Sequence, residues 1–94
     1  MQIHVRVAGL MLGEAITEAF DEEVPGGGLT LGQVLDALDK NRKMGKKFFK
    51  RLLKSERPPT ILLNGMRIDL PEGLETKVDE GAELSIVSPI AGGK

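Results

Sequence analysis

The fold of this chain is decided by residues 30–38, which read TLGQVLDAL. Thr30 and Gln33 form the pattern of a capping box, in which the threonine hydroxyl accepts a hydrogen bond from the Gln33 amide and the glutamine side chain reaches back to the Thr30 amide. Apolar residues recur at spacings of three and four, as in a helix that packs one face on a sheet; they are Leu31, Val34, Leu35 and Leu38. The pattern predicts a helix that begins here and ends near Asn41.

Two strands are predicted before this helix, because apolar and polar residues alternate there with the period of a half-buried strand. One face of the first strand consists of Ile3, Val5 and Val7. The second strand is expected at residues 15–24, and one of its faces consists of Ile16, Phe20 and Val24. Residues 9–13 are interpreted as the connection, and the Pro-Gly-Gly-Gly run at residues 25–28 ends the hairpin.

A second helix and three further strands are predicted after the first helix. The helical period continues through Met44, Phe48, Phe49, Leu52 and Leu53, until Pro58 and Pro59 forbid continuation. Residues 60–63 and 66–70 predict a hairpin around Asn64-Gly65, a pair that accepts the positive φ angles of a type I′ turn. Residues 83–87 predict a final strand.

This order of elements predicts an α+β fold of the β-grasp, or ubiquitin-like, type. Two hairpins flank one main helix that crosses a face of a mixed sheet, and the first and last strands lie side by side and parallel. The basic helix is interpreted as an addition to this layout. A chain of this length forms one core, so we expect a single domain over residues 1–94 with a flexible tail at about 89–94.

The composition argues against an enzyme with its own active site. Because the chain has no cysteine, it has no disulfide, zinc knuckle or thiol nucleophile. His4 has no second ligand at metal spacing and is interpreted as a surface residue of the first strand. Residues 26–28 lack the Gly-Lys-Ser/Thr sequence of a phosphate loop. We expect a protein that binds no cofactor or metal of its own.

The hydropathy pattern gives no sign of a membrane protein. No stretch of about 18 apolar residues is present to cross a bilayer. The first residues alternate between apolar and polar and do not form an apolar signal segment. We therefore expect a soluble, cytoplasmic protein with no membrane partner.

Charge is distributed unevenly along the sequence. Residues 40–57 contain nine Lys or Arg residues and one acid, Glu56, which gives a net charge of +8, whereas the rest of the chain carries four basic and thirteen acidic residues, a net charge of −9. The segment is interpreted as a solvated helix face over a small core. If it has a function, docking to an acidic protein surface is favoured over nucleic-acid binding, because Phe48 and Phe49 occupy buried helix positions and no aromatic residue forms a stacking platform.

Three segments of the chain resemble a known family. Residues 63–65 (LNG), 79–84 (DEGAEL) and 88–93 (SPIAGG) resemble the small subunit of molybdopterin synthase and the thiamin sulfur carrier, the MoaD/ThiS-like family of ubiquitin-like proteins. Together with the helix entry at residues 30–38, the resemblance covers nearly all the chain outside residues 40–57.

The resemblance implies that Gly93 is the reacting residue. Its carboxylate is adenylated by an E1-like activating enzyme, converted to a thiocarboxylate, and inserted into the large subunit of molybdopterin synthase, where it donates sulfur to precursor Z. The adenylate and the thiocarboxylate are thus formed by partner enzymes, and the chain is a carrier subunit. Glycine fits this role because a strand without side chains passes through a narrow channel.

The expected partner-binding residues lie in and around the tail. Apolar groups beside a flexible terminus can anchor a partner, and the set consists of Met66, Pro89, Ile90, Ala91, Gly92 and Gly93. A competing interpretation of Met66 is that it fills core space. Lys94 departs from the family pattern, because only a free Gly93 carboxylate can be adenylated; the carrier function therefore requires that the Gly93–Lys94 bond be absent or cleaved.

Two other functions remain open from the sequence. A ubiquitin-like modifier would join Gly93 to a lysine of a target protein, and its activation begins in the same way. A noncovalent interaction module would use the basic helix and would need no tail.

Overall fold

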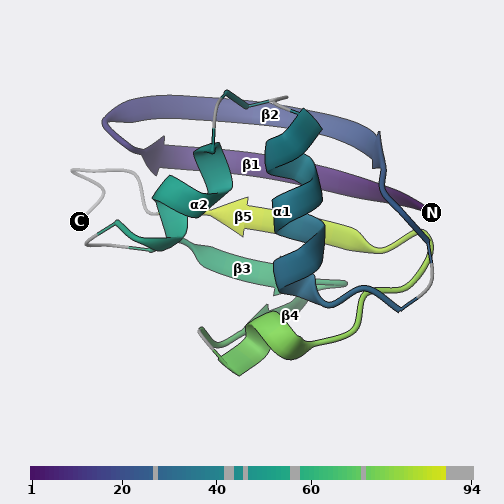
Figure 1. Cartoon of the computed structure of the whole chain (residues 1–94). Helices are drawn as coiled ribbons and strands as arrows, with labels where there is room; N and C mark the ends of the chain where they lie inside the picture. The colour runs from purple at the N-terminus through teal and green to yellow at the C-terminus, as the bar shows by residue number, and fades with distance from the viewer. Residues whose placement is uncertain (27, 42–43, 46, 56–57, 71, 89–94) are drawn as a thin grey trace.

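The computed structural model describes residues 1–26, 28–41, 44–45, 47–55, 58–70 and 72–88. Five strands form one sheet in the order β2-β1-β5-β3-β4. Their bounds are Gln2–Met11 (β1), Glu14–Glu23 (β2), Thr60–Leu63 (β3), Met66–Ile68 (β4) and Glu83–Val87 (β5). The helices α1 (Leu31–Asn41) and α2 (Phe48–Leu53) lie on one face of this sheet, as Figure 1 shows. The predicted α+β, β-grasp architecture is confirmed.

The centre of the sheet is the parallel pair of β1 and β5. Val5 is paired with Leu84 and Val7 with Ile86, whereas β2 pairs with β1, and β3 with β5, in antiparallel register. The first and last strands of the chain are therefore neighbours, as predicted. Because a crossover is needed to join parallel strands, the helices between them are held against one sheet face.

The core lies between that face and α1. The residues predicted to face inward on the first strand, Ile3, Val5 and Val7, are at most 2 % exposed. The stripe on α1 is buried as well, and it consists of Leu31, Val34, Leu35 and Leu38. Thr30 N donates to Gln33 Oε1 at 2.9 Å and Gln33 N to Thr30 Oγ1 at 3.3 Å, so the predicted capping box is present.

The first hairpin is longer than the sequence indicated. β1 continues through Gly9 to Met11, and the turn is only Leu12-Gly13, with φ angles of 50° and 81°. Two successive residues with positive φ form a tight hairpin turn whose twist matches that of the strands. The expected connection at residues 9–13 was therefore wrong in its first three positions, which belong to the strand.

The second helix is shorter than predicted. α2 has six residues, and Lys47 before it adopts a left-handed conformation with φ 53°, which a right-handed helix cannot contain. Met44 therefore lies outside the helix. The predicted inward residues Phe48, Phe49 and Leu52 are buried. Asp39 on α1 accepts hydrogen bonds from the amides of Phe49 (2.8 Å) and Lys50 (3.0 Å), which ties the start of α2 to α1.

The hairpin around Asn64-Gly65 is confirmed, with φ angles of 53° and 83°. Its returning strand, expected at residues 66–70, ends at Ile68. A short 3₁₀ helix, η1 (Glu72–Glu75), follows and was not predicted. The final strand occupies the predicted residues.

Candidate functional site

The end of β5 determines where the C-terminal segment leaves the sheet. β5 runs between β1 and β3, and Val87 is paired with Ala8 on one side and Thr60 on the other. The Ser88 amide then donates to the Ala8 carbonyl at 3.0 Å. The backbone is thus held on both sides up to Val87, and at Ser88 by β1. The predicted site residues Pro89, Ile90, Ala91, Gly92 and Gly93 lie outside the described residues.

The end of β5 closely approaches Gly9 on β1. Gly9 has a φ of 127°, and a Cβ atom placed on it would lie 2.2 Å from Ser88 O and 2.8 Å from Ser88 N. No side chain fits into that space. Gly9 therefore allows the Ser88 backbone to lie close against β1.

Sequence reasoning missed this role of Gly9. It placed Gly9 in a turn, since glycine commonly ends a strand. The available signal was a glycine inside a period-two pattern, which indicates a bulge or a close approach of another backbone. Which backbone approaches depends on the parallel pairing of β1 with β5.

Met66 is exposed but does not lie beside residue 88. Met66 is 72 % exposed, so it does not fill core space. It is paired with Leu63, which is paired with Leu84 near the start of β5. Ser88 lies four positions after Leu84, which is about 13 Å at the rise per residue of a β-strand. Met66 and the exit of the tail are therefore at opposite ends of β5.

The sheet face away from the helices, the outer face, carries a group of apolar residues near the tail exit. Ala8 and Val87 are half-buried and paired with each other, and Leu10 follows on the same face of β1 at 37 % exposure. Leu62 on β3 lies on this face one pair further from the exit.

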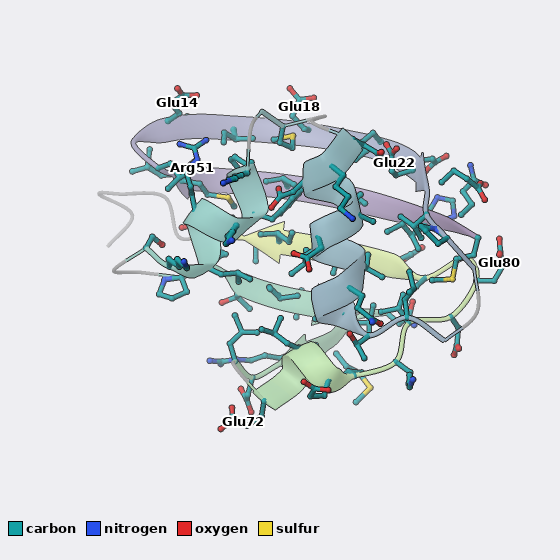
Figure 2. The ribbon with its side chains drawn as sticks, viewed as in Figure 1. Glu14, Glu18, Glu22, Arg51, Glu72 and Glu80 are labelled. Atoms are coloured by element: carbon teal, nitrogen blue, oxygen red, sulfur yellow. The ribbon has the colours of Figure 1, made fainter. Side chains whose placement is uncertain are left out.

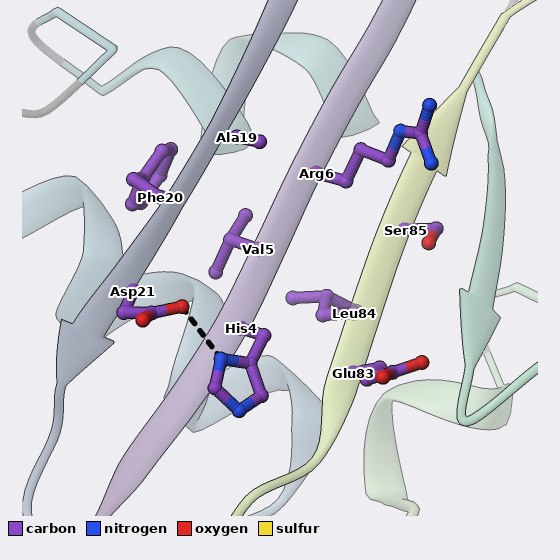
Figure 3. A pocket seen from close by; sticks show the side chains of 9 residues that line it. All are labelled: His4, Val5, Arg6, Ala19, Phe20, Asp21, Glu83, Leu84 and Ser85. Atoms are coloured by element: carbon purple, nitrogen blue, oxygen red, sulfur yellow. Dashed lines mark hydrogen bonds and ion pairs between the residues drawn. The ribbon is translucent and has the colours of Figure 1, made fainter.

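A shallow hollow at the polar end of the outer face surrounds His4 (Figure 3). The ring Nδ1 lies 2.5 Å from Asp21 Oδ1, and this hydrogen bond together with the charge of Asp21 raises the pKa of His4 above its ordinary value. Ser85 also lines the hollow, but no hydrogen bond joins it to His4 among the described residues. His4 is exposed on β1, a surface strand residue as predicted.

The part of the chain that the structure describes contains no group of three His, Cys, Asp or Glu side chains that could hold a metal ion. None of its helices has the length and apolar character required to span a bilayer.

The comparisons with known proteins agree with this fold. The ThiS family model matches residues 11–93. No curated protein matches the sequence. The crystal structure of SAMP1 from Haloferax volcanii is similar with a TM-score of 0.66 and 22 % identity, covering 99 % of this chain and 100 % of that chain.

Two further solved structures share the architecture. A chain of the Amycolatopsis orientalis BexX/CysO complex matches with a TM-score of 0.63 and 22 % identity, over 97 % of this chain and 99 % of that chain. The solution structure of the Haloferax volcanii HVO 2177 protein matches with a TM-score of 0.57 and 22 % identity, over 99 % and 87 %. The solved structures show a shared ubiquitin-like fold, and because the family model matches residues 11–93, the chain belongs to the ThiS family.

Proposed function

We propose that this protein carries sulfur as a thiocarboxylate on Gly93 and donates it in the biosynthesis of molybdopterin. The observation that carries the proposal is that the family match extends through residue 93, five residues beyond the point where β5 and Gly9 hold the backbone. A short segment anchored at its base and ending in glycine can enter a partner's active site while the folded domain remains outside.

The chemistry requires two partners. In the first step an oxygen of the Gly93 carboxylate attacks the α-phosphate of ATP and pyrophosphate leaves, which forms an acyl adenylate on an E1-like enzyme. In the second step the sulfur of a sulfide ion attacks the acyl carbon and AMP leaves, which forms the thiocarboxylate. In this proposal the domain itself supplies no catalytic group in either step.

The large subunit of molybdopterin synthase is the proposed acceptor. The support is the resemblance of residues 63–65, 79–84 and 88–93 to the small subunit of that enzyme. Lys94 follows Gly93 in the sequence. Because Gly93 has no free carboxylate while it is joined to Lys94, the proposal requires hydrolysis of the Gly93–Lys94 bond before activation.

Activation can be tested with three matched proteins: the chain ending at Gly93, the chain ending at Lys94, and a chain ending at Gly92. Each is incubated with the E1-like enzyme of the same organism, ATP and sulfide, and pyrophosphate release and intact mass are measured. Only the chain ending at Gly93 is expected to release pyrophosphate and gain the mass difference between sulfur and oxygen. Equal activity of all three proteins, or of none, contradicts the proposal.

The destination of the sulfur requires a second measurement. The thiocarboxylated chain is mixed with the large subunit of molybdopterin synthase and precursor Z, and molybdopterin is measured by mass. Formation of molybdopterin with return of the carrier to its carboxylate form is expected. In cells, bonds between Gly93 and lysines of other proteins that survive reducing agents would instead favour the ubiquitin-like modifier.

A further inference from the structure

The close contact between Gly9 and Ser88 lies where the chain leaves the last paired position of β5. Val87 has a partner on each side, Ala8 on β1 and Thr60 on β3. A further backbone hydrogen bond runs from Ser88 N to Ala8 O at 3.0 Å. A Cβ atom on Gly9 would lie 2.2 Å from Ser88 O. The observed position of Ser88 therefore requires that residue 9 has no side chain.

The part of β1 around Gly9 is held more firmly than Ser88. β2 is paired with β1 over residues 2–11, which extends to both sides of Gly9. Glu14 and Glu18, labelled in Figure 2, stand on β2 two residues to either side of the position opposite Gly9. Ser88, in contrast, follows the last residue of β5 that is paired on both sides. A side chain at residue 9 is therefore expected to displace Ser88 and to leave the hairpin of β1 and β2 in place.

The position of Ser88 limits how far the following segment can extend. Under the proposed function the reacting group is the carboxylate of Gly93, five residues beyond Ser88. Five extended residues span at most about 18 Å. Each residue released from the sheet lengthens this reach by about 3.3 Å and adds backbone freedom that is lost again when the tail enters an active site. The reach and the freedom of the reacting group thus depend on a contact at the base of the tail.

We propose that Gly9 is a positioning residue for the activation of Gly93. Together with the hydrogen bond from Ser88 to Ala8, it anchors the base of the tail and sets how far the Gly93 carboxylate reaches into the E1-like enzyme. This inference rests on the proposed function and adds to it a residue that acts through Ser88. Misplacement of a reacting group by about 1 Å can cost about a hundredfold in rate, so a fixed anchor matters for the reaction.

A purely structural role of Gly9 makes a different prediction. In that case Gly9→Ala destabilises the domain but leaves the reach of the tail unchanged in every folded molecule. Removal of one tail residue then has the same effect whether residue 9 is glycine or alanine. If Gly9 instead sets the reach, the release of Ser88 supplies about one residue of length and compensates for the missing one. The two roles are separated by the coupling between the two changes.

The test combines release of Ser88 with shortening of the tail in a double-mutant cycle. Gly9→Ala releases Ser88 by the clash, and Ser88→Pro releases the same residue by removing the N–H that bonds to Ala8. Each substitution is made in the chain ending at Gly93, with and without deletion of Ala91. For every protein, kcat and KM for pyrophosphate release by the E1-like enzyme are measured.

Two controls isolate the effect of tail length. Gly13→Ala changes another glycine of positive φ, where a Cβ would meet nothing within 4 Å, so it adds backbone strain without displacing Ser88. Ala91→Gly keeps the length of the tail and measures the loss of the methyl group separately from the loss of length. All proteins are assayed well below the melting temperature of the least stable variant, and far-UV circular dichroism verifies that each is folded.

We expect deletion of Ala91 from the otherwise unchanged chain to lower kcat by about a hundredfold with a smaller change in KM, because the domain still docks while the carboxylate falls short. In the Gly9→Ala and Ser88→Pro backgrounds the same deletion should cost about tenfold or less. With a tail of full length, each of these two backgrounds should lose about tenfold, since one more residue must be ordered. In the Gly13→Ala background the deletion should cost as much as in the unchanged chain.

Failure of this inference can be told apart from failure of the proposed function. The inference is overturned, and the carrier function stands, if deletion of Ala91 costs the same factor in all backgrounds, if Gly13→Ala relieves the loss as well, or if the unchanged chain tolerates the deletion. If Gly9→Ala does not fold, the Ser88→Pro background decides between these outcomes. If the unsubstituted chain ending at Gly93 releases no pyrophosphate, the proposed function fails and the inference falls with it.

Discussion

Replacing Gly9 with alanine tests whether the close approach of β1 and Ser88 is a structural requirement. The added Cβ would lie 2.2 Å from the carbonyl oxygen of Ser88 and 2.8 Å from its nitrogen, well inside van der Waals contact. Both atoms belong to the backbone, so no side chain can rotate away. Either β1 must shift, or the end of β5 must leave the sheet.

The magnitude follows from two contributions. A residue with a side chain at the φ of 127° observed here costs about 1–3 kcal/mol in backbone strain. Loss of the hydrogen bond from Ser88 N to Ala8 O costs about 1 kcal/mol. We expect the free energy of unfolding to fall by about 2–4 kcal/mol, a large part of the roughly 5–15 kcal/mol typical of a domain.

Gly13→Ala provides the matched control. Gly13 also has a positive φ, 81°, but a Cβ there would meet nothing within 4 Å, so the substitution introduces strain of about 1–2 kcal/mol without the clash. Because the chain contains no Trp or Tyr, urea unfolding is followed by far-UV circular dichroism and extrapolated linearly.

A local response is also measurable. If the end of β5 detaches instead of destabilising the whole domain, the Ser88 amide should exchange with solvent hydrogen faster in the variant, since opening of a strand end precedes global unfolding. The reasoning is refuted if Gly9→Ala costs no more stability than Gly13→Ala and Ser88 exchange is unchanged.

Three further predictions concern the scaffold. Thr30→Ala removes the capping-box acceptor seen at 3.3 Å and should lower the free energy of unfolding by about 1 kcal/mol in urea titrations; Thr30→Ser should restore most of it, and a silent Thr30→Ala would contradict the role of the cap. Phe49→Ala empties a site that is 1 % exposed and should cost about 3–5 kcal/mol; a loss below 1 kcal/mol, by the same assay, would mean that α2 is not part of the core. The pKa of His4 is raised by Asp21, so the pair should stabilise the fold below the unfolded pKa of histidine and cease to do so as pH rises through the higher folded pKa; Asp21→Asn should return the His4 pKa toward 6.5 in an NMR titration, and an unmoved titration would refute the assignment.

The helix α1 and the turn at Asn64-Gly65 were predictable because their determinants are local. A capping box involves groups three residues apart, and a type I′ turn depends on the φ preferences of two residues. The period of two in β1 likewise identified its buried face before any partner strand was known. These signals were sufficient for the element order, and the element order was sufficient for the fold.

The length of α2 and the positions around the tail were not predictable in this way. The apolar residues that follow Lys47 recur with a helical period, yet Lys47 itself adopts a φ of 53° and lies outside the helix. The start of α2 is instead held by Asp39, whose carboxylate accepts hydrogen bonds from the amides of Phe49 and Lys50. The hairpin that contains Met66 was predicted correctly, but the distance between Met66 and residue 88 depends on which strands are neighbours in the sheet. The first result depends on a contact between the two consecutive helices, and the second on which strands pair.

The sequence by itself therefore indicated a β-grasp domain with a segment that contains Ala91-Gly92-Gly93 after its last strand. Only the tertiary structure decided how that segment is anchored. The parallel pairing of β1 with β5 brings Ser88 against Gly9, and Phe48 and Arg51 of α2 line a pocket with Met11 and Leu12. Periodicity reports which face of an element is buried, whereas the register between elements, which no local pattern encodes, determines what lies beside the tail.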